Sequence, residues 1–206
     1  MTRDSDTAIA AAYDARAAEY LDLAGRIDQM EAVDRDLIAR WRDATPGTLL
    51  DAGCGPGHWT EFLHDGAREV VGIDLSAEFL ASARTAFPHL RFLEGTFRGL
   101  PFPDGSVGGI LSWYSLIHSP PVAVPAALAE FARVLAPGGS LLLGFFDGEP
   151  REQFAHAVLP AWFWSADALA EVLTAAGFDV VERERRERVA GEASRRPHGS
   201  VTARRV

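Results

Sequence analysis

Apolar residues recur along this chain with two different spacings. Short apolar runs that end at Gly, Asp or Pro predict buried strands, and they cover residues 48–51, 70–74, 91–93, 107–113 and 141–145, with two more around 178–181 and 200–203. Between these runs, apolar residues at three- and four-residue intervals predict amphipathic helices. The helices are expected at about residues 6–23, 33–41, 58–63, 76–83, 128–134 and 165–173.

The alternation of strands and helices indicates one architecture. Strands that are joined through helices by short connections form a mostly parallel sheet with helices on both faces. We therefore expect an α/β, three-layer sandwich with a seven-stranded, mostly parallel sheet, an antiparallel last strand and an N-terminal helical cap. The 206 residues are the length of one domain, with residues 1–45 as the cap of a single compact unit.

Composition narrows the classes of partner and chemistry. The formal net charge of −9 argues against a nucleic-acid or anionic membrane partner, and the Arg residues of the C-terminal quarter are interleaved with Glu. The chain contains no Lys, which excludes Schiff-base chemistry. Cys54 is its single cysteine, so neither an intramolecular disulfide nor a thiolate zinc cluster can form, and we expect no metal site.

The same survey gives an expectation for location and assembly. No apolar run approaches the roughly 18 residues that suggest a membrane span, and the first residues lack the apolar core of a signal peptide. We expect a cytoplasmic protein without a membrane partner, either a monomer or a homodimer.

Glycines cluster where the first predicted strand turns into a helix. The segment Asp51-Ala52-Gly53-Cys54-Gly55-Pro56-Gly57-His58-Trp59 allows a tight turn and a close approach of the backbone to a ligand. The second strand ends in Asp74, where a carboxylate can accept both hydroxyls of a ribose. Ligands of such sheets bind beyond the carboxyl ends of the strands, so this pair predicts a nucleoside cofactor.

The glycine spacing separates two classes of nucleoside cofactor. Dinucleotide sites use G-x-G-x-x-G, whereas this loop reads G-x-G-x-G, with His58 at the position of the third dinucleotide glycine. Asp51 at the mouth of the loop would repel a pyrophosphate, but it suits an ammonium group. A cofactor with a ribose, an ammonium and no phosphate is S-adenosyl-L-methionine, which gives S-adenosyl-L-homocysteine as its product.

At this point the sequence resembles a known family. Leu49–Gly57 is similar to the first motif of the class I, Rossmann-like S-adenosylmethionine-dependent methyltransferases of the small-molecule type. Further segments resemble their later motifs in the same order; these are Val71–Ser76, Leu100–Ser106, Arg133–Gly139 and Ala175–Phe178. The resemblance implies a methyltransferase domain over residues 46–206, and it implies that the loop glycines line the cofactor while Asp74 holds its ribose.

Several further residues are candidates for the cofactor site. The family commonly has an acidic residue after the third strand that binds the adenine amine, but this chain has Glu94-Gly95-Thr96-Phe97 there. We expect Thr96 to accept that bond and Phe97 to pack on the ring. The full set of cofactor-binding candidates is Tyr13, Asp51, Gly53, Gly55, Gly57, His58, Trp59, Asp74, Leu75, Thr96, Phe97, Ser112 and Trp113.

The acceptor side is expected after the fourth and fifth strands. His118 and Tyr114 are the catalytic candidates, with His118 as a base for a hydroxyl acceptor; the alternative is that His118 packs beside the adenine or caps a helix. Residues 148–164 form an aromatic insert, either a lid over the acceptor or a patch that covers the sheet edge. The substrate candidates are Phe146, His156, Trp162 and His198, the last of which can equally lie in a surface loop.

Three functions fit these observations. The leading interpretation is an enzyme that moves a methyl group from S-adenosylmethionine to a small-molecule acceptor by in-line displacement. The second is a nicotinamide-dependent oxidoreductase on the same fold, and the third is a non-catalytic S-adenosylmethionine-binding protein. The acceptor atom, N, O, S or C, is left open.

Overall fold

The computed structural model describes residues 3–188, 192, 194 and 196–206. The strands of its main sheet are β1 Leu49–Ala52, β2 Val70–Asp74, β3 Arg91–Glu94, β4 Val107–Trp113, β5 Leu135–Phe146, β8 Phe178–Arg186 and β9 His198–Arg205. The helices are α1 Arg3–Asp14, α2 Ala17–Ala24, α3 Ala32–Ala44, α4 His58–Leu63, α5 Ala77–Ala86, α6 Val124–Val134 and α7 Ala166–Ala175, with a 3-10 turn at Ile27–Gln29.

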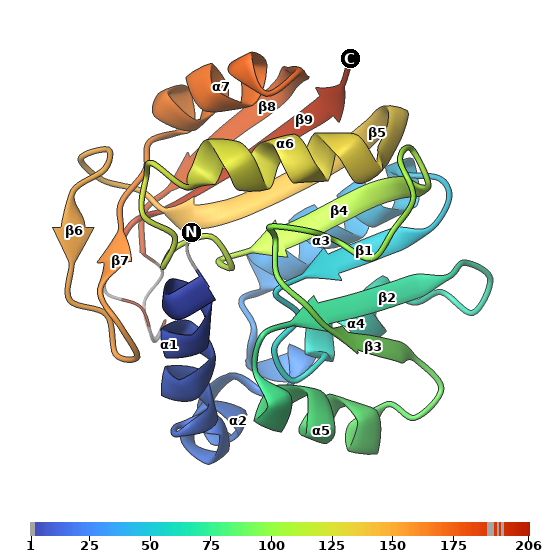
Figure 1. Ribbon diagram of the computed structural model, residues 1–206, viewed down its shortest axis with the longest axis vertical. Coiled ribbons are helices and arrows are strands. Elements are labelled where there is room, and N and C mark those ends of the chain that lie inside the picture. Colours follow the sequence, from blue (N-terminus) through green and yellow to red (C-terminus); the bar gives the residue numbers. More distant parts are fainter. Residues whose placement is uncertain (1–2, 189–191, 193, 195) are drawn as a thin grey trace.

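The seven strands pair in the order β3-β2-β1-β4-β5-β9-β8 (Figure 1). Strands β1 to β5 pair in parallel, whereas β9 runs antiparallel to both β5 and β8. This topology confirms the predicted mostly parallel sheet with an antiparallel last strand. The order reverses between β1 and β4, which is where ligands bind in open sheets of this kind.

Two apolar layers hold helices on opposite faces of the sheet. On one face, Leu128 and Phe131 of α6 and Leu173 of α7 pack against strand residues such as Ile110. On the other face, Ile38 and Trp41 of α3 join Leu49 and Leu111 of the central strands. Each of these fully buried large side chains contributes on the order of 1.5–3 kcal/mol, so the position of the central strands is strongly fixed.

Helix α1 lies across the carboxyl ends of the central strands (Figure 1). The predicted single helix over residues 6–23 is interrupted, because α1 ends at Asp14 and α2 begins at Ala17. Asp14 uses its carboxylate to accept from the Ser76 hydroxyl at 2.6 Å, a contact that α1 reaches at its end. The break therefore docks the N-terminal segment against the start of α5.

Other boundaries differ from the predicted ones where tertiary pairing extends an element. Strands β8 and β9 are longer than predicted because they pair with one another along most of their lengths. The aromatic insert contains a small hairpin, β6 Gln153–Phe154 with β7 Ala161–Trp162.

Among the described residues, no helix is long and apolar enough to cross a membrane. The division into a cap over residues 1–45 and a domain over 46–206 stays a prediction.

Candidate functional site

The glycine loop between β1 and α4 bends back onto the end of β2. The amides of Gly53 and Cys54 both donate to the carbonyl of Ile73, at 2.8 and 3.0 Å. Gly53, Gly55 and Gly57 have φ angles of 83°, 52° and 86°, a region that side chains other than glycine rarely adopt. The predicted tight turn is therefore built from left-handed backbone at each of its three glycines.

The three glycines serve different purposes. A Cβ at Gly53 would lie 2.2 Å from Cβ of Ser115, and one at Gly57 would lie 2.9 Å from the ring of Phe92. These two positions therefore need glycine for packing. A Cβ at Gly55 would meet only the ring of Phe79, at 3.9 Å, so the backbone of Gly55 borders open space beside Asp74.

Asp74 is anchored through both of its carboxylate oxygens. Oδ2 accepts from the amide of Gly55 at 2.8 Å, and Oδ1 accepts from the amide of Ser76 at 2.8 Å. Burial raises the pKa of this carboxyl above its usual value, while backbone donors from Ser76, Gly55 and Leu75 counter that effect. Since each carboxylate oxygen has a second lone pair, the arrangement presents two oriented acceptors, as recognition of two ribose hydroxyls requires.

Asp51 is a second buried carboxylate at the same end of the sheet. Its side chain is 1% exposed, and Oδ2 accepts from the hydroxyl of Thr60 at 2.7 Å. Burial raises its pKa to about 7. A buried carboxylate without a cationic partner is costly, so a positively charged ligand would stabilise the ionised form. The role of Asp51 toward an ammonium group stays a prediction.

The remaining loop and strand candidates are distributed between the site and the core. His58 begins α4, is 5% exposed and has no partner for Nδ1; burial lowers its pKa to about 4. Trp59 and Trp113 pack against one another with ring centroids 6.4 Å apart, in the apolar layer that α3 covers. Ser112, which alternates with Trp113 along β4, pairs with Ser115 at 2.6 Å next to Gly53.

The segment after β3 is tied to the N-terminal helix. The Thr96 hydroxyl donates to Oδ2 of Asp6 at 2.8 Å, and Phe97 packs on Phe131 with ring centroids 5.3 Å apart. Leu75, next to Asp74, is half-buried. Sequence reasoning missed Asp6, because nothing in the local pattern of α1 indicates a contact with a residue 90 positions away.

Tyr13 places a phenol between Phe79 of α5 and His118 of the loop after β4. Its ring lies 5.6 Å from that of Phe79 on α5, and its hydroxyl lies 2.9 Å from Nε2 of His118. The Nδ1 atom of His118 lies 3.0 Å from the carbonyl oxygen of Pro160, which can only accept, so Nδ1 carries the proton. In neutral His118, Nε2 is therefore the acceptor, and Tyr13 donates to it.

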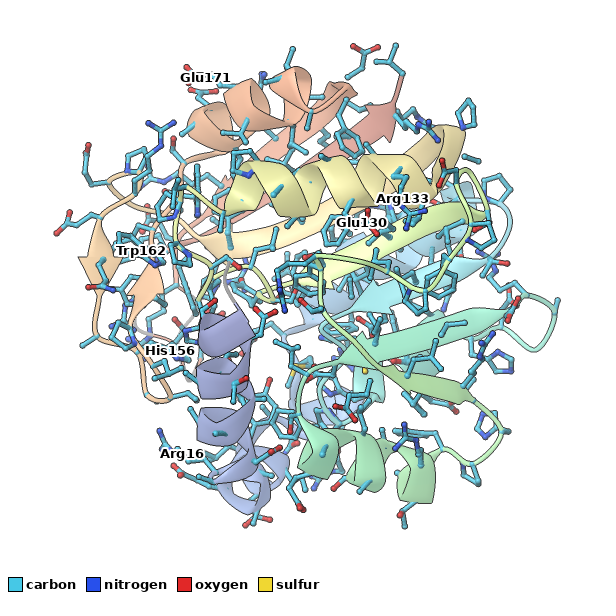
Figure 2. All side chains as sticks on the ribbon, in the orientation of Figure 1. Arg16, Glu130, Arg133, His156, Trp162 and Glu171 are labelled. Atoms are coloured by element: carbon cyan, nitrogen blue, oxygen red, sulfur yellow. The ribbon has the colours of Figure 1, made fainter. Side chains whose placement is uncertain are left out.

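His118 belongs to a group of rings that we call the acceptor cluster. Its members are Tyr114, His118, Phe146, Phe154, His156 and His198, which form a continuous set of ring contacts. His156 lies beside α1 (Figure 2), its ring 5.1 Å from that of His118. Trp162, also labelled in Figure 2, is half-buried on β7, with its amide bonded to the carbonyl of Ile117.

Tyr114 sits at the centre of this cluster in an unusual backbone conformation. Its φ of 55° is costly for a residue with a bulky side chain and marks functional sites more often than others. Its hydroxyl bonds to Nδ1 of His198, and Nε2 of His198 lies 2.9 Å from the carboxylate of Glu192. Arg186 joins Glu192 to Asp34 behind this pair. His198 is thus buried at the start of β9 rather than in a surface loop, and its role toward a substrate stays a prediction.

The histidines of the acceptor cluster are uncharged near neutral pH. Burial lowers the pKa values of His156 and His198 to about 4 and also lowers that of His118. Burial raises the pKa of the Tyr114 phenol. Among the described residues, no group of three or more His, Cys, Asp or Glu side chains is placed to hold a metal ion.

Similarity to known proteins was found over the same part of the chain. Residues 49–139 match the family described as "Methyltransferase domain"; the match begins at β1 and includes the glycine loop and Asp74. The chain is 40% identical over 91 residues to malonyl-acyl-carrier-protein O-methyltransferase from Pectobacterium atrosepticum, covering 44% of this chain and 35% of that protein.

Two further relatives extend the similarity. The chain is 35% identical over 150 residues to trans-aconitate 2-methyltransferase from Methylobacterium nodulans, covering 69% of this chain and 54% of that protein. The chain thus spans about a third to about half of the length of these curated relatives. The crystal structure of Burkholderia thailandensis 1,6-didemethyltoxoflavin-N1-methyltransferase with S-adenosylhomocysteine superimposes with a TM-score of 0.74 at 25% identity, covering 96% of this chain and 88% of that one.

Proposed function

Because the chain belongs to the class I S-adenosylmethionine-dependent methyltransferases, we propose that it transfers a methyl group from S-adenosyl-L-methionine to a small-molecule acceptor. The observation that carries this proposal is the anchored carboxylate of Asp74, which lies against the amide of Gly55 where the glycine loop leaves room for a ligand. The buried carboxylate of Asp51 adds a site for the ammonium group, which a dinucleotide lacks.

The protein has a limited task in this reaction. When bound, the cofactor supplies an electrophilic methyl group on a positively charged sulfur. Asp74 and the Gly55 backbone would hold the adenosine, and Asp51 would hold the amino-acid end. Helix α1 covers this region through Tyr13 and Asp14 and excludes water, while orientation of the two reactants supplies most of the rate enhancement.

His118 accepts the proton of a hydroxyl acceptor in this proposal. Its Nε2 is the free base in the neutral tautomer, and it is oriented by the bond from Nδ1 to the carbonyl of Pro160. Because burial lowers the pKa of His118, the imidazole stays unprotonated at neutral pH, as a general base must be. Tyr13 occupies Nε2 in the closed form, so an acceptor hydroxyl replaces the phenol there.

The acceptor cluster favours an uncharged aromatic acceptor with a hydroxyl group. Phe146 and Tyr114 offer ring faces at a centroid separation of 4.9 Å, while His118, His156 and His198 are neutral donors and acceptors. The guanidiniums of Arg186 and Arg196 adjoin these rings, and both have partners. Arg186 pairs with Asp34 and Glu192. Arg196 lies over the Phe154 ring, with Cζ 4.3 Å from its centroid, and donates to the carbonyl of Ala155. The aromatic faces and neutral imidazoles of the cluster therefore favour an uncharged acceptor over an acidic one such as that named for the M. nodulans relative, and Arg196 is the residue on which an acidic acceptor would depend.

A transfer assay tests the proposal. The protein is incubated with methyl-labelled S-adenosylmethionine and a panel of phenols, dicarboxylic acids and amines, and the label is followed into product. We expect transfer to phenols, and at a limiting cofactor concentration Asp74→Ala should reduce it strongly. If no member of the panel is methylated although S-adenosylhomocysteine binds tightly, a non-catalytic cofactor-binding protein becomes the better interpretation; transfer to dicarboxylic acids alone would contradict the acceptor assignment.

A further inference from the structure

A carboxylate from the N-terminal helix stands at the end of β3, where the strand itself supplies none. Glu94 is exposed at the last position of β3, and a Cβ at Gly95 would lie 2.5 Å from Cδ1 of Ile73. The following residue is Thr96. The acidic side chain at this end of the sheet is instead Asp6, from the second turn of α1.

Asp6 is held from one side only. Its Oδ2 atom accepts from the Thr96 hydroxyl at 2.8 Å and from Nε of Arg98 at 2.6 Å. The residue is 5% exposed, yet its other oxygen, Oδ1, is buried and has no hydrogen-bond partner. A buried acceptor without a donor is costly, so this oxygen is an unfilled position for an N–H or O–H group.

The position of this oxygen relative to Asp74 is informative. The amide of Gly95 donates to the carbonyl of Asp74 at 2.9 Å, and Asp74 pairs with Glu94 in the sheet register. Thr96 and Asp6 therefore lie one strand beyond the carboxylate that is assigned to the ribose. A base attached to a ribose at Asp74 would therefore have Thr96 and Asp6 as neighbours at the adjoining strand end.

From these contacts we propose that Oδ1 of Asp6 accepts a hydrogen bond from the exocyclic amino group of the cofactor's adenine. This inference rests on the proposed function. Oδ2 is fully used by Thr96 and Arg98, and an ionised carboxylate can only accept. The pair therefore selects a base that donates at its 6-position, and it rejects one that presents a carbonyl there.

The assignment gives α1 two roles. The helix closes over the site through Tyr13 and Asp14. In the same docked position it places Asp6 where the carboxylate can distinguish one base from another. Base selection and closure of the site are then one event, because Asp6 reaches Thr96 only when α1 is docked. A cofactor with the wrong base would leave Oδ1 of Asp6 unpaired.

Binding of three cofactor analogues tests this inference without an activity measurement. Calorimetry compares S-adenosylhomocysteine with its inosine analogue, in which a carbonyl replaces the amino group, and with a purine analogue that lacks any 6-substituent. The wild-type protein should prefer the adenine compound by about tenfold or more, equivalent to ~1.4 kcal/mol. Asp6→Ala should bind the adenine and purine compounds equally.

Two further variants separate base reading from helix docking. In Asp6→Asn, the amide oxygen takes the bonds from Thr96 and Arg98, which turns the NH2 group toward the base; the preference should shift toward the inosine analogue. Asp14→Ala loosens α1 at Ser76 without touching the base, so it should weaken all three ligands by the same factor. Circular dichroism and thermal melting verify that each variant is folded.

The outcomes distinguish this inference from the function on which it rests. If the wild-type protein binds none of the three compounds, the cofactor assignment itself is wrong. The inference is overturned if the wild-type protein binds S-adenosylhomocysteine and both Asp6 variants keep its order of preference among the three ligands. In that case Asp6 only links α1 to the segment after β3. Loss of the preference in Asp6→Ala together with its shift in Asp6→Asn supports it.

Discussion

The hydroxyl of Tyr13 on α1 lies 2.9 Å from Nε2 of His118, in the loop after β4. This single contact joins the covering helix to the candidate base, and it stabilises the neutral form of the imidazole because that form accepts the bond. Burial lowers the pKa of His118. The structure thus couples closure of the site to the protonation state of His118.

Tyr13→Phe should shift the pH dependence of turnover. A base works when it is unprotonated, so the rate rises with pH and levels off above the pKa of His118. Removal of the phenol donor and the looser packing both raise this pKa toward its usual value, which moves the midpoint to higher pH. Steady-state kcat/KM between pH 5 and 8 measures the shift, because it reports the free enzyme, in which Tyr13 occupies Nε2.

Tyr20→Phe is the matched control, since Tyr20 packs on Phe79 with ring centroids 5.0 Å apart and no contact to His118 is observed for its hydroxyl among the described residues. The midpoint should stay in place. His118→Gln should lower kcat and abolish the rise of the rate with pH, while the affinity for the cofactor changes little. A wild-type rate that is independent of pH over this range would remove the base role from His118.

Asp51 should release a proton when the cofactor product binds. Its pKa is raised to about 7 in the free protein by burial, and an ammonium beside it favours the ionised form and lowers the pKa. Affinity for S-adenosylhomocysteine should therefore increase as the pH rises toward 7 and then level off. Calorimetry at pH 6.5 in buffers of different ionisation enthalpy measures the number of protons released.

Asp51→Asn keeps an acceptor for Thr60 but has no carboxylate to titrate. This variant should bind without proton release and with an affinity reduced about tenfold or more, on the scale of a bond to a charged group. The raised pKa also means that the folded wild-type protein retains a proton that the unfolded chain loses, so its stability falls as the pH rises from about 4 to about 7. The variant should lack this fall; equal pH dependence of Tm in both proteins would refute the burial argument.

Asp74→Ala should weaken binding of S-adenosylhomocysteine by roughly 1.5–3 kcal/mol, the scale of hydrogen bonds to a charged group. The loss includes the loop anchor, because Oδ2 of Asp74 holds the amide of Gly55. The exposed Asp36 on α3 provides the control, and Asp36→Ala should bind as the wild type does. Unchanged affinity in Asp74→Ala, measured by calorimetry, would exclude the ribose role.

Two glycine substitutions separate binding from folding. Gly55→Val places a β-branched side chain at a φ of 52°, which costs about 1–2 kcal/mol in backbone strain. The new side chain also fills the open space beside Asp74. We expect a folded protein that no longer binds S-adenosylhomocysteine. Gly108→Ala instead brings Cβ within 2.0 Å of the Pro46 carbonyl oxygen, remote from the loop. It should lower the Tm through a strain of about 1–3 kcal/mol, while the folded fraction still binds.

Local patterns predicted the parts of the site that neighbours in the chain create. The glycine loop and the end of β2 at Asp74 follow from turn preferences that act over a few residues.

Contacts between distant segments were beyond the reach of such patterns. The interruption between Asp14 and Ala17, the meeting of Asp6 with Thr96 and the hairpin of β6 and β7 all depend on where α1 and the insert dock. Trp59 and Trp113 were predicted at the cofactor, but they pack in the layer beneath α3; the sequence places both near the loop without fixing which face of the sheet they occupy. Their role at the cofactor stays a prediction.

The central claim is that the glycine loop and Asp74 hold an adenosine that is attached to an amino acid. A crystal structure of the protein with S-adenosylhomocysteine tests it most directly. We predict electron density for the ribose at the carboxylate of Asp74 and for the ammonium group at Asp51. Crystals that take up no ligand at this loop, or that bind a nicotinamide dinucleotide there instead, would contradict the account.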